Sequence, residues 1–103
     1  MFYVKLHKSS NPDKKYMVVI NYTKTNQEHK ATVHFGDSEM SDYTLHKDPA
    51  RKRNYITRHK TNENWKISGI ETAGFWSRWL LWNKPTIKES KTDITKKFDV
   101  VFI

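Results

Sequence analysis

The residues best suited to binding chemistry are the cations between positions 47 and 60. Six basic side chains stand there against a single acid, Asp48, and they are Lys47, Arg51, Lys52, Arg53, Arg58 and Lys60. Like charges at helical spacing repel by roughly a few tenths of a kcal/mol per pair, and a chain that tolerates this repulsion usually has an anion to offset it. DNA phosphates fit, because Lys and Arg contacts release the counterions condensed on DNA. The alternative is a solvated helix face, which the formal net charge of +8 over the whole chain makes less favoured.

A second group of cations lies nearer the C-terminus. Its members are Lys84, Lys88, Lys91, Lys96 and Lys97. Glu89 and Asp93 interleave with them and weaken the signal. If the two groups share a face, they form a broad phosphate-binding surface, to which we assign Lys84 and Lys88 as well. The sequence has no zinc-finger spacing, RNP motif or clear helix-turn-helix, so binding should not depend on base sequence.

An aromatic segment over residues 75–82 could make a different kind of contact. Its rings could stack on unpaired bases, and Trp and Arg are enriched in the hot spots of protein interfaces. The candidate partner-binding residues are Trp76, Arg78, Trp79 and Trp82. Core packing is the competing interpretation, and it is favoured because the chain has few other large apolar residues.

Catalytic and cofactor chemistry finds little support. The chain has no cysteine, which excludes disulfides, thiolate zinc sites and cysteine nucleophiles. Three glycines leave little for a loop that cradles phosphate, and no two histidines have the i, i+4 spacing of a helical metal pair. We therefore expect no enzymatic activity, cofactor, metal or small-molecule substrate. A metal-dependent nuclease that uses His46 and His59 is the remaining catalytic alternative.

Three strands are expected in the first third of the chain. Residues 2–8 and 30–35 alternate between apolar and polar side chains, the period of a half-buried strand. Residues 16–23 form a β-branched and aromatic run suited to a central strand. Turn residues at 9–13 and a polar loop at 23–28 link the strands, which predicts an antiparallel meander.

Three helices are expected to follow. Asp48 and a proline at the first helical position start a helix over 49–60, whose inward stripe is Tyr55, Ile56 and His59. The second, over 73–82, is apolar nearly all round, as buried helices are.

A third helix over 87–98 starts at a capping box, and residues 100–103 could add a last strand. The predicted fold class is α+β, with one domain over residues 1–103. In it an antiparallel sheet of three N-terminal strands plus a C-terminal strand packs against three helices. No apolar run suffices for a signal peptide or a membrane span, so we expect a soluble, cytosolic chain that has no membrane partner and is not secreted.

Several short motifs follow one another between residues 32 and 93. They are Thr32-Val33-His34-Phe35-Gly36, Ser41-Asp42-Tyr43-Thr44, His46-Lys47-Asp48, Arg51-Lys52, Tyr55-Ile56, Arg58-His59, Glu63-Asn64-Trp65, Thr72-Ala73-Gly74-Phe75-Trp76 and Leu80-Leu81-Trp82-Asn83-Lys84-Pro85-Thr86. In this order they resemble a family of small, largely uncharacterised proteins of giant DNA viruses of the mimivirus and phycodnavirus kind. The resemblance departs at residues 37–40, where Glu39 and Met40 stand in the places of a glycine and an aromatic residue. It implies a viral source and no known catalytic residues.

Two functions of different classes remain. The first is a non-enzymatic protein of a large DNA virus that binds DNA phosphates and is packaged in the virion, after assembly in the host cytoplasm. The second is a virion structural protein, such as a minor capsid component, that contacts capsid proteins through strand edges and the Trp and Arg residues of the aromatic segment. Affinity that falls steeply with salt indicates the first, whereas salt-insensitive association with capsid protein indicates the second.

Overall fold

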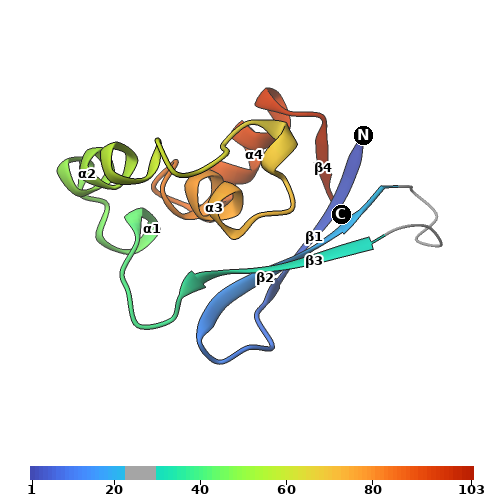
Figure 1. The fold of residues 1–103 in the computed structure, drawn as a ribbon, viewed down its shortest axis with the longest axis horizontal. Coiled ribbons are helices and arrows are strands. Elements are labelled where there is room, and N and C mark those ends of the chain that lie inside the picture. Colours follow the sequence, from blue (N-terminus) through green and yellow to red (C-terminus); the bar gives the residue numbers. More distant parts are fainter. Residues whose placement is uncertain (23–29) are drawn as a thin grey trace.

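The computed structural model describes residues 1–22 and 30–103, which form an α+β fold (Figure 1). Its strands are β1 (Phe2–Lys8), β2 (Lys14–Asn21), β3 (Lys30–Asp37) and β4 (Val100–Phe102). β1, β2 and β3 pair as an antiparallel meander, which confirms that part of the prediction. The predicted polar loop over 23–28 lies outside the described residues.

The fourth strand corrects the predicted sheet, because β4 lies beside β1 and runs parallel to it. The strand order is β3-β2-β1-β4, so the sheet is mixed rather than antiparallel. The reason lies in the connection: β3 ends at the same end of the sheet as β1, and the helices carry the chain back to the other end. β4 then enters in the direction of β1, as the long crossover between parallel strands requires.

The end of β3 depends on Gly36. Its φ is +79°, a conformation that glycine adopts without strain. A Cβ placed there would lie 2.8 Å from Cδ1 of Leu81, a buried core side chain. β2 and β3 each extend two residues beyond their predicted limits at this end, since Lys14 pairs with Asp37. The turn after β3 forms without a glycine at Glu39, whose N–H donates to the Asp37 carboxylate.

The helical layer contains more pieces than predicted. It consists of α1 (Tyr43–His46), α2 (Pro49–His59), a 3-10 turn η1 (Ile67–Gly69), α3 (Ala73–Trp76), a π turn η2 (Ser77–Leu81) and α4 (Ile87–Lys97). α2 and α4 match their predicted ranges to within a residue. α1 and η1 are too short to leave a periodic pattern in the sequence.

The predicted helix over 73–82 is divided into α3 and the π turn η2. The N–H of Trp82 donates to the carbonyl of Ser77, five residues earlier, at 3.0 Å. One extra residue is thereby accommodated in the turn. Leu80 and Leu81 can then both be buried, while the Trp82 ring reaches Tyr55 of α2.

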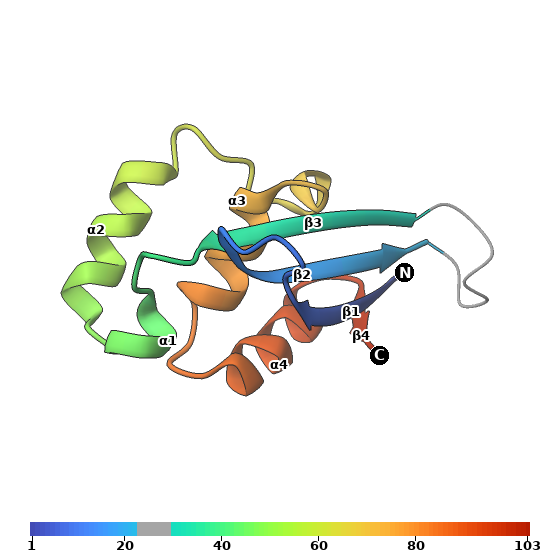
Figure 2. The same cartoon turned by 90° about the horizontal axis from the view of Figure 1, so that it is seen from below.

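The helices lie on one face of the sheet, and the opposite face carries none (Figure 1). The core between the layers includes Val18, Ile20 and Phe35 from the sheet and Phe75 and Trp76 from the helices. α2 does not cover the sheet but lies at one end of the molecule, beyond the ends of β2 and β3 (Figure 2). The predicted basic helix therefore occupies an exposed end of the protein.

Candidate nucleic-acid interface

The basic helix α2 is fixed at its start by Asp48, whose side chain accepts a hydrogen bond from the N–H of Ala50 at 2.9 Å. Its inward stripe is as predicted: Tyr55 is buried, and Ile56 and His59 are half-buried. The Tyr55 ring stacks on Trp82 with centroids 4.4 Å apart and an interplanar angle of 1°. These contacts hold one side of α2 against the protein and leave the other side in solvent.

The exposed cations of α2 form two rows. Arg51 and Arg58 are seven residues apart and so project within about 20° of each other around the helix axis. Arg53 and Lys60 form a matching pair about 160° away. All four side chains are exposed. We call them the α2 cation rows.

Small and polar residues line the ridge between the rows. Ala50, Asn54 and Thr57 are exposed there and project between the two pairs of cations. None of them extends as far from the helix axis as an arginine. A polyanion could therefore approach the helix backbone closely while touching cations on both flanks.

No acid neutralises the α2 cation rows within the described part of the chain. The ion pairs there join the N-terminal ammonium to Asp99, Lys15 to Asp42, His59 to Glu63, and Lys97 to Asp93. The four cations of the rows take part in none of them. Their charges are thus available to an external anion.

Two of the predicted phosphate-binding residues have internal partners instead. Lys52 is half-buried, and its ammonium donates to the carbonyl of Asn83 at 2.6 Å and lies 5.1 Å from the Tyr43 ring centre. Burial, together with the charges of Arg78 and Lys84, lowers the pKa of Lys52. Position 52 also precedes Tyr55 by three residues and Ile56 by four, a spacing that already places it on the inward stripe.

Lys47 is exposed but folds back on its own helix. It ends α1 with φ +56°, and its ammonium donates to the carbonyl of Thr44 at 2.8 Å. This bond lies at the surface, so an anion could compete for it.

The second group of cations meets the first at Lys84. The Lys52 bond to Asn83 brings the chain before α4 against α2, and Lys84 is exposed beside it. Lys88 is exposed on the first turn of α4. Farther along α4, Lys97 pairs with Asp93 at 3.7 Å. Lys84 and Lys88 line one surface hollow together with Lys96, which lies farther along α4.

The aromatic segment packs largely inside the molecule. Trp76 is fully buried, and its indole N–H donates to the carbonyl of Ile70 at 2.7 Å. Trp76 is therefore a core residue rather than a contact for a partner, because a partner would have to unfold the core to reach it. Trp79 and Trp82 are half-buried.

Arg78 is held among these rings. Its guanidinium lies 4.4 Å from the Trp79 ring centre and 5.4 Å from that of Trp65, and it donates to the carbonyl of Trp82 at 2.8 Å. Burial lowers the pKa of Arg78. The four residues assigned to partner binding thus do not form one exposed patch, and core packing accounts for most of their contacts.

The two histidines of the nuclease hypothesis are both packed against aromatic rings. His46 accepts a hydrogen bond from the N–H of Asp48 at 2.9 Å, and its ring centre lies 5.3 Å from that of Trp82. His59 stacks on Tyr55 with centroids 4.4 Å apart. Within the described residues, no group of three or more His, Cys, Asp or Glu side chains could hold a metal ion.

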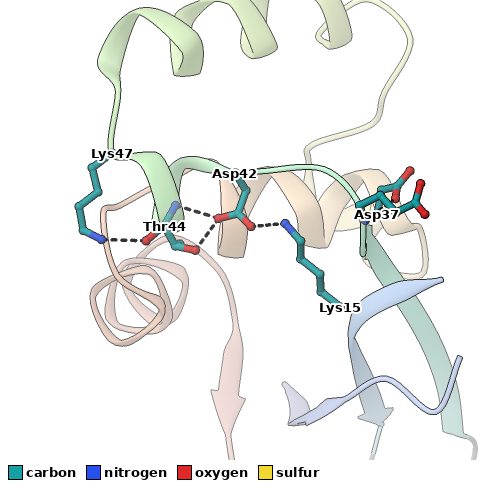
Figure 3. Close-up of polar contacts among 6 residues, drawn as sticks. Lys15, Asp37, Asp42, Thr44 and Lys47 are labelled. Carbon is teal, nitrogen blue, oxygen red and sulfur yellow. Dashed lines mark hydrogen bonds and ion pairs between the residues drawn. The ribbon is translucent and has the colours of Figure 1, made fainter. Parts of the chain in front are cut away.

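A buried ion pair joins the helical layer to the sheet close to α2. Asp42 is almost fully buried and accepts hydrogen bonds from Lys15 of β2, at 2.6 Å, and from the N–H and hydroxyl of Thr44 (Figure 3). A cavity of about 330 Å³ opens beside it, between α2, α3 and the ends of β2 and β3. Arg58 of the α2 cation rows and Lys14 of β2 lie at its wall. The sequence alone gave no sign that these segments meet.

Residues 4–59 match a family of unknown function, DUF5754. The chain belongs to this family. No curated protein and no solved structure matches the chain. Within the described residues, no helix has both the length and the apolar character needed to cross a membrane.

The part shared with DUF5754 runs from β1 to the end of α2. It includes the sheet strands β1 to β3, the Lys15–Asp42 pair and the basic helix. The family description supplies no function, and the resemblance to proteins of giant DNA viruses stays a prediction.

Proposed function

We propose that this protein is a small, non-enzymatic DNA-binding protein that contacts phosphates without sequence specificity through α2. The observation that carries the proposal is the pair of exposed α2 cation rows, which no described acid neutralises. Phosphate contacts of this kind position a protein on nucleic acid and carry no base information. Lys47, Lys84 and Lys88 extend the same surface.

The two rows suit a duplex better than a single strand. A helix of 11 residues is about 16 Å long and, with its side chains, about 10–12 Å across, and the major groove of B-DNA is about 12 Å wide, enough to admit it lengthwise. With α2 along the groove, Arg51 and Arg58 face one phosphate backbone while Arg53 and Lys60 face the other.

Packaging with a viral genome is the cellular role that we propose for this activity. A source among the giant DNA viruses, presence in the virion and assembly in the host cytoplasm all rest on the sequence resemblance. A basic protein that binds DNA of any sequence would suit such a role, since it needs no particular site on the genome.

The salt dependence of binding tests the proposal. The four phosphate contacts of the α2 cation rows alone predict a slope of log affinity against log salt of about −3.6, and hence about a hundredfold loss of affinity between 50 and 200 mM salt. Contacts from Lys47, Lys84 and Lys88 would make the slope more negative. Fluorescence anisotropy with a labelled duplex and a single strand of the same length measures both slopes. Tighter binding of the duplex supports the groove geometry, and failure to bind at 50 mM salt refutes the function.

A minor capsid component is the second candidate, and the sheet favours it in one respect. β3 is an edge strand with no neighbour on its outer side among the described residues. Such an edge can pair with a strand of another protein. Association with capsid protein that survives high salt, in a variant without DNA affinity, would support this candidate instead.

A further inference from the structure

The face of the sheet that the helices leave uncovered carries its own set of side chains. Strand pairing and alternation place on it Tyr3, Lys5, His7, Met17, Val19, Thr32, His34 and Val101. None of these residues is acidic. Figure 1 shows the sheet between this face and the helical layer, so the face is separate from the cavity and the buried contacts described above.

Two histidines and a methionine form a row across this face. Met17 of β2 pairs directly with His7 of β1 on one side and with His34 of β3 on the other. Side chains directly opposite in neighbouring antiparallel strands have Cβ atoms about 4.5–5.5 Å apart. The Cβ atoms of His7 and His34 therefore flank that of Met17 on the same face of the sheet.

His34 is already oriented by a second side chain. Its Nδ1 and the Ser9 hydroxyl oxygen are 2.7 Å apart. The same oxygen accepts a hydrogen bond from the N–H of Asn11 at 3.0 Å. When Nδ1–H donates to Ser9, Nε2 of His34 carries the lone pair that a metal requires. Hydrogen bonding of the second ring nitrogen is the usual way in which proteins orient a ligating histidine.

We propose that His7, Met17 and His34 bind one Cu(I) ion on the open face of the sheet. The thioether decides the class of metal, because soft sulfur ligands select Cu(I), whereas Mg²⁺, Ca²⁺ and Mn²⁺ require carboxylate or carbonyl oxygens. Histidine nitrogen is also a ligand for copper. The site contains two histidines and no acid, so only the methionine completes a set of three ligands.

The proposal does not depend on DNA binding. α2 lies beyond the ends of the strands, on the side of the helical layer (Figure 1). Variants of His7, Met17 or His34 therefore leave the phosphate-binding residues of α2 intact. Loss of one activity without the other is expected in both directions.

Anaerobic titration with Cu(I) against the chromogenic chelator bicinchoninate tests the proposal. We expect one equivalent of Cu(I) to bind the full-length protein, and Met17→Leu to weaken binding at least tenfold. Leucine conserves the volume of Met17, so the fold should persist, which circular dichroism checks. Met40→Leu is the matched control, because Met40 is exposed in the turn after β3, and it should bind as the wild type does.

Ligand assignment comes from histidine ring signals in NMR spectra with Ag(I), a redox-inert substitute for Cu(I). Only the rings of His7 and His34 should shift strongly, and Ser9→Ala should weaken binding about tenfold by releasing His34. Equal affinity of Met17→Leu and wild type would overturn the proposal. So would shifts spread evenly over all five histidines, which would indicate adventitious binding only.

Discussion

Replacing Asp42 by Ala should destabilise the fold more than any surface substitution of an acid. Asp42 joins the helical layer to β2 through Lys15, and it caps α1 through Thr44 (Figure 3). The exposed fractions of the Asp42 and Lys15 side chains are 2% and 15%. Removal of the carboxylate would leave the Lys15 ammonium largely buried and without its partner.

The magnitude follows from these contacts. Breaking a buried ion pair by removing one partner costs about 3–5 kcal/mol, and the partial exposure of Lys15 favours the lower end. Loss of an N-cap costs about 1 kcal/mol more. We therefore expect a loss of about 4 kcal/mol in the free energy of unfolding, and a fall in Tm of roughly 16–32 °C.

Urea denaturation followed by circular dichroism measures this loss. Asp13→Ala, in the exposed β1–β2 turn, is the matched control and should stay within about 0.5 kcal/mol of wild type. Lys15→Met combined with Asp42→Ala should be less destabilised than the sum of the single variants by about 1 kcal/mol or more, since neither charge is then left alone. A loss below about 1 kcal/mol for Asp42→Ala, or strict additivity in the double variant, would show that the buried Lys15–Asp42 pair does not stabilise the fold.

Two further predictions concern the turn after β3 and the contact between α1 and α2. Gly36→Ala should cost about 2–5 kcal/mol in urea denaturation, because it combines a positive φ with a clash against buried Leu81; a neutral effect would contradict the described backbone. Burial, aided by the charge of Arg51, lowers the pKa of His46 from 6.5. As the pH falls through 6.5, the unfolded chain binds more protons at this position than the folded chain does, so the free energy of unfolding decreases on acidification. Tm should therefore drop less between pH 7.5 and 5.5 in His46→Gln than in wild type, and equal drops would count against this role.

The local elements could largely be predicted from the sequence. Alternation of side chains located β1, and the caps at Asp48 and Thr86 located the starts of α2 and α4, where both side chains accept the expected backbone hydrogen bonds. Each of these signals is carried by residues that lie close together in the sequence. Local sequence therefore suffices to specify them.

Features that depend on distant segments could not be predicted in this way. The direction of β4 follows from the path of the helices, and the π turn before Trp82 follows from packing against Tyr55. The row of His7, Met17 and His34 depends on strand register, which no spacing in the sequence reveals. The inward position of Lys52 differs from these features, because the sequence itself shows that Lys52 precedes Tyr55 by three residues.

Two charge-matched double variants, compared in one anisotropy experiment, show whether α2 binds DNA phosphates. Arg51→Gln with Arg58→Gln removes one of the α2 cation rows, and Lys5→Gln with Lys8→Gln removes two exposed charges from β1. Net charge falls equally in both. We expect the first variant alone to weaken binding to duplex DNA and to make the salt slope less negative by about 1.8, as two lost phosphate contacts require. Equal effects of the two variants would show that net charge, and not α2, governs binding, and would contradict the claim.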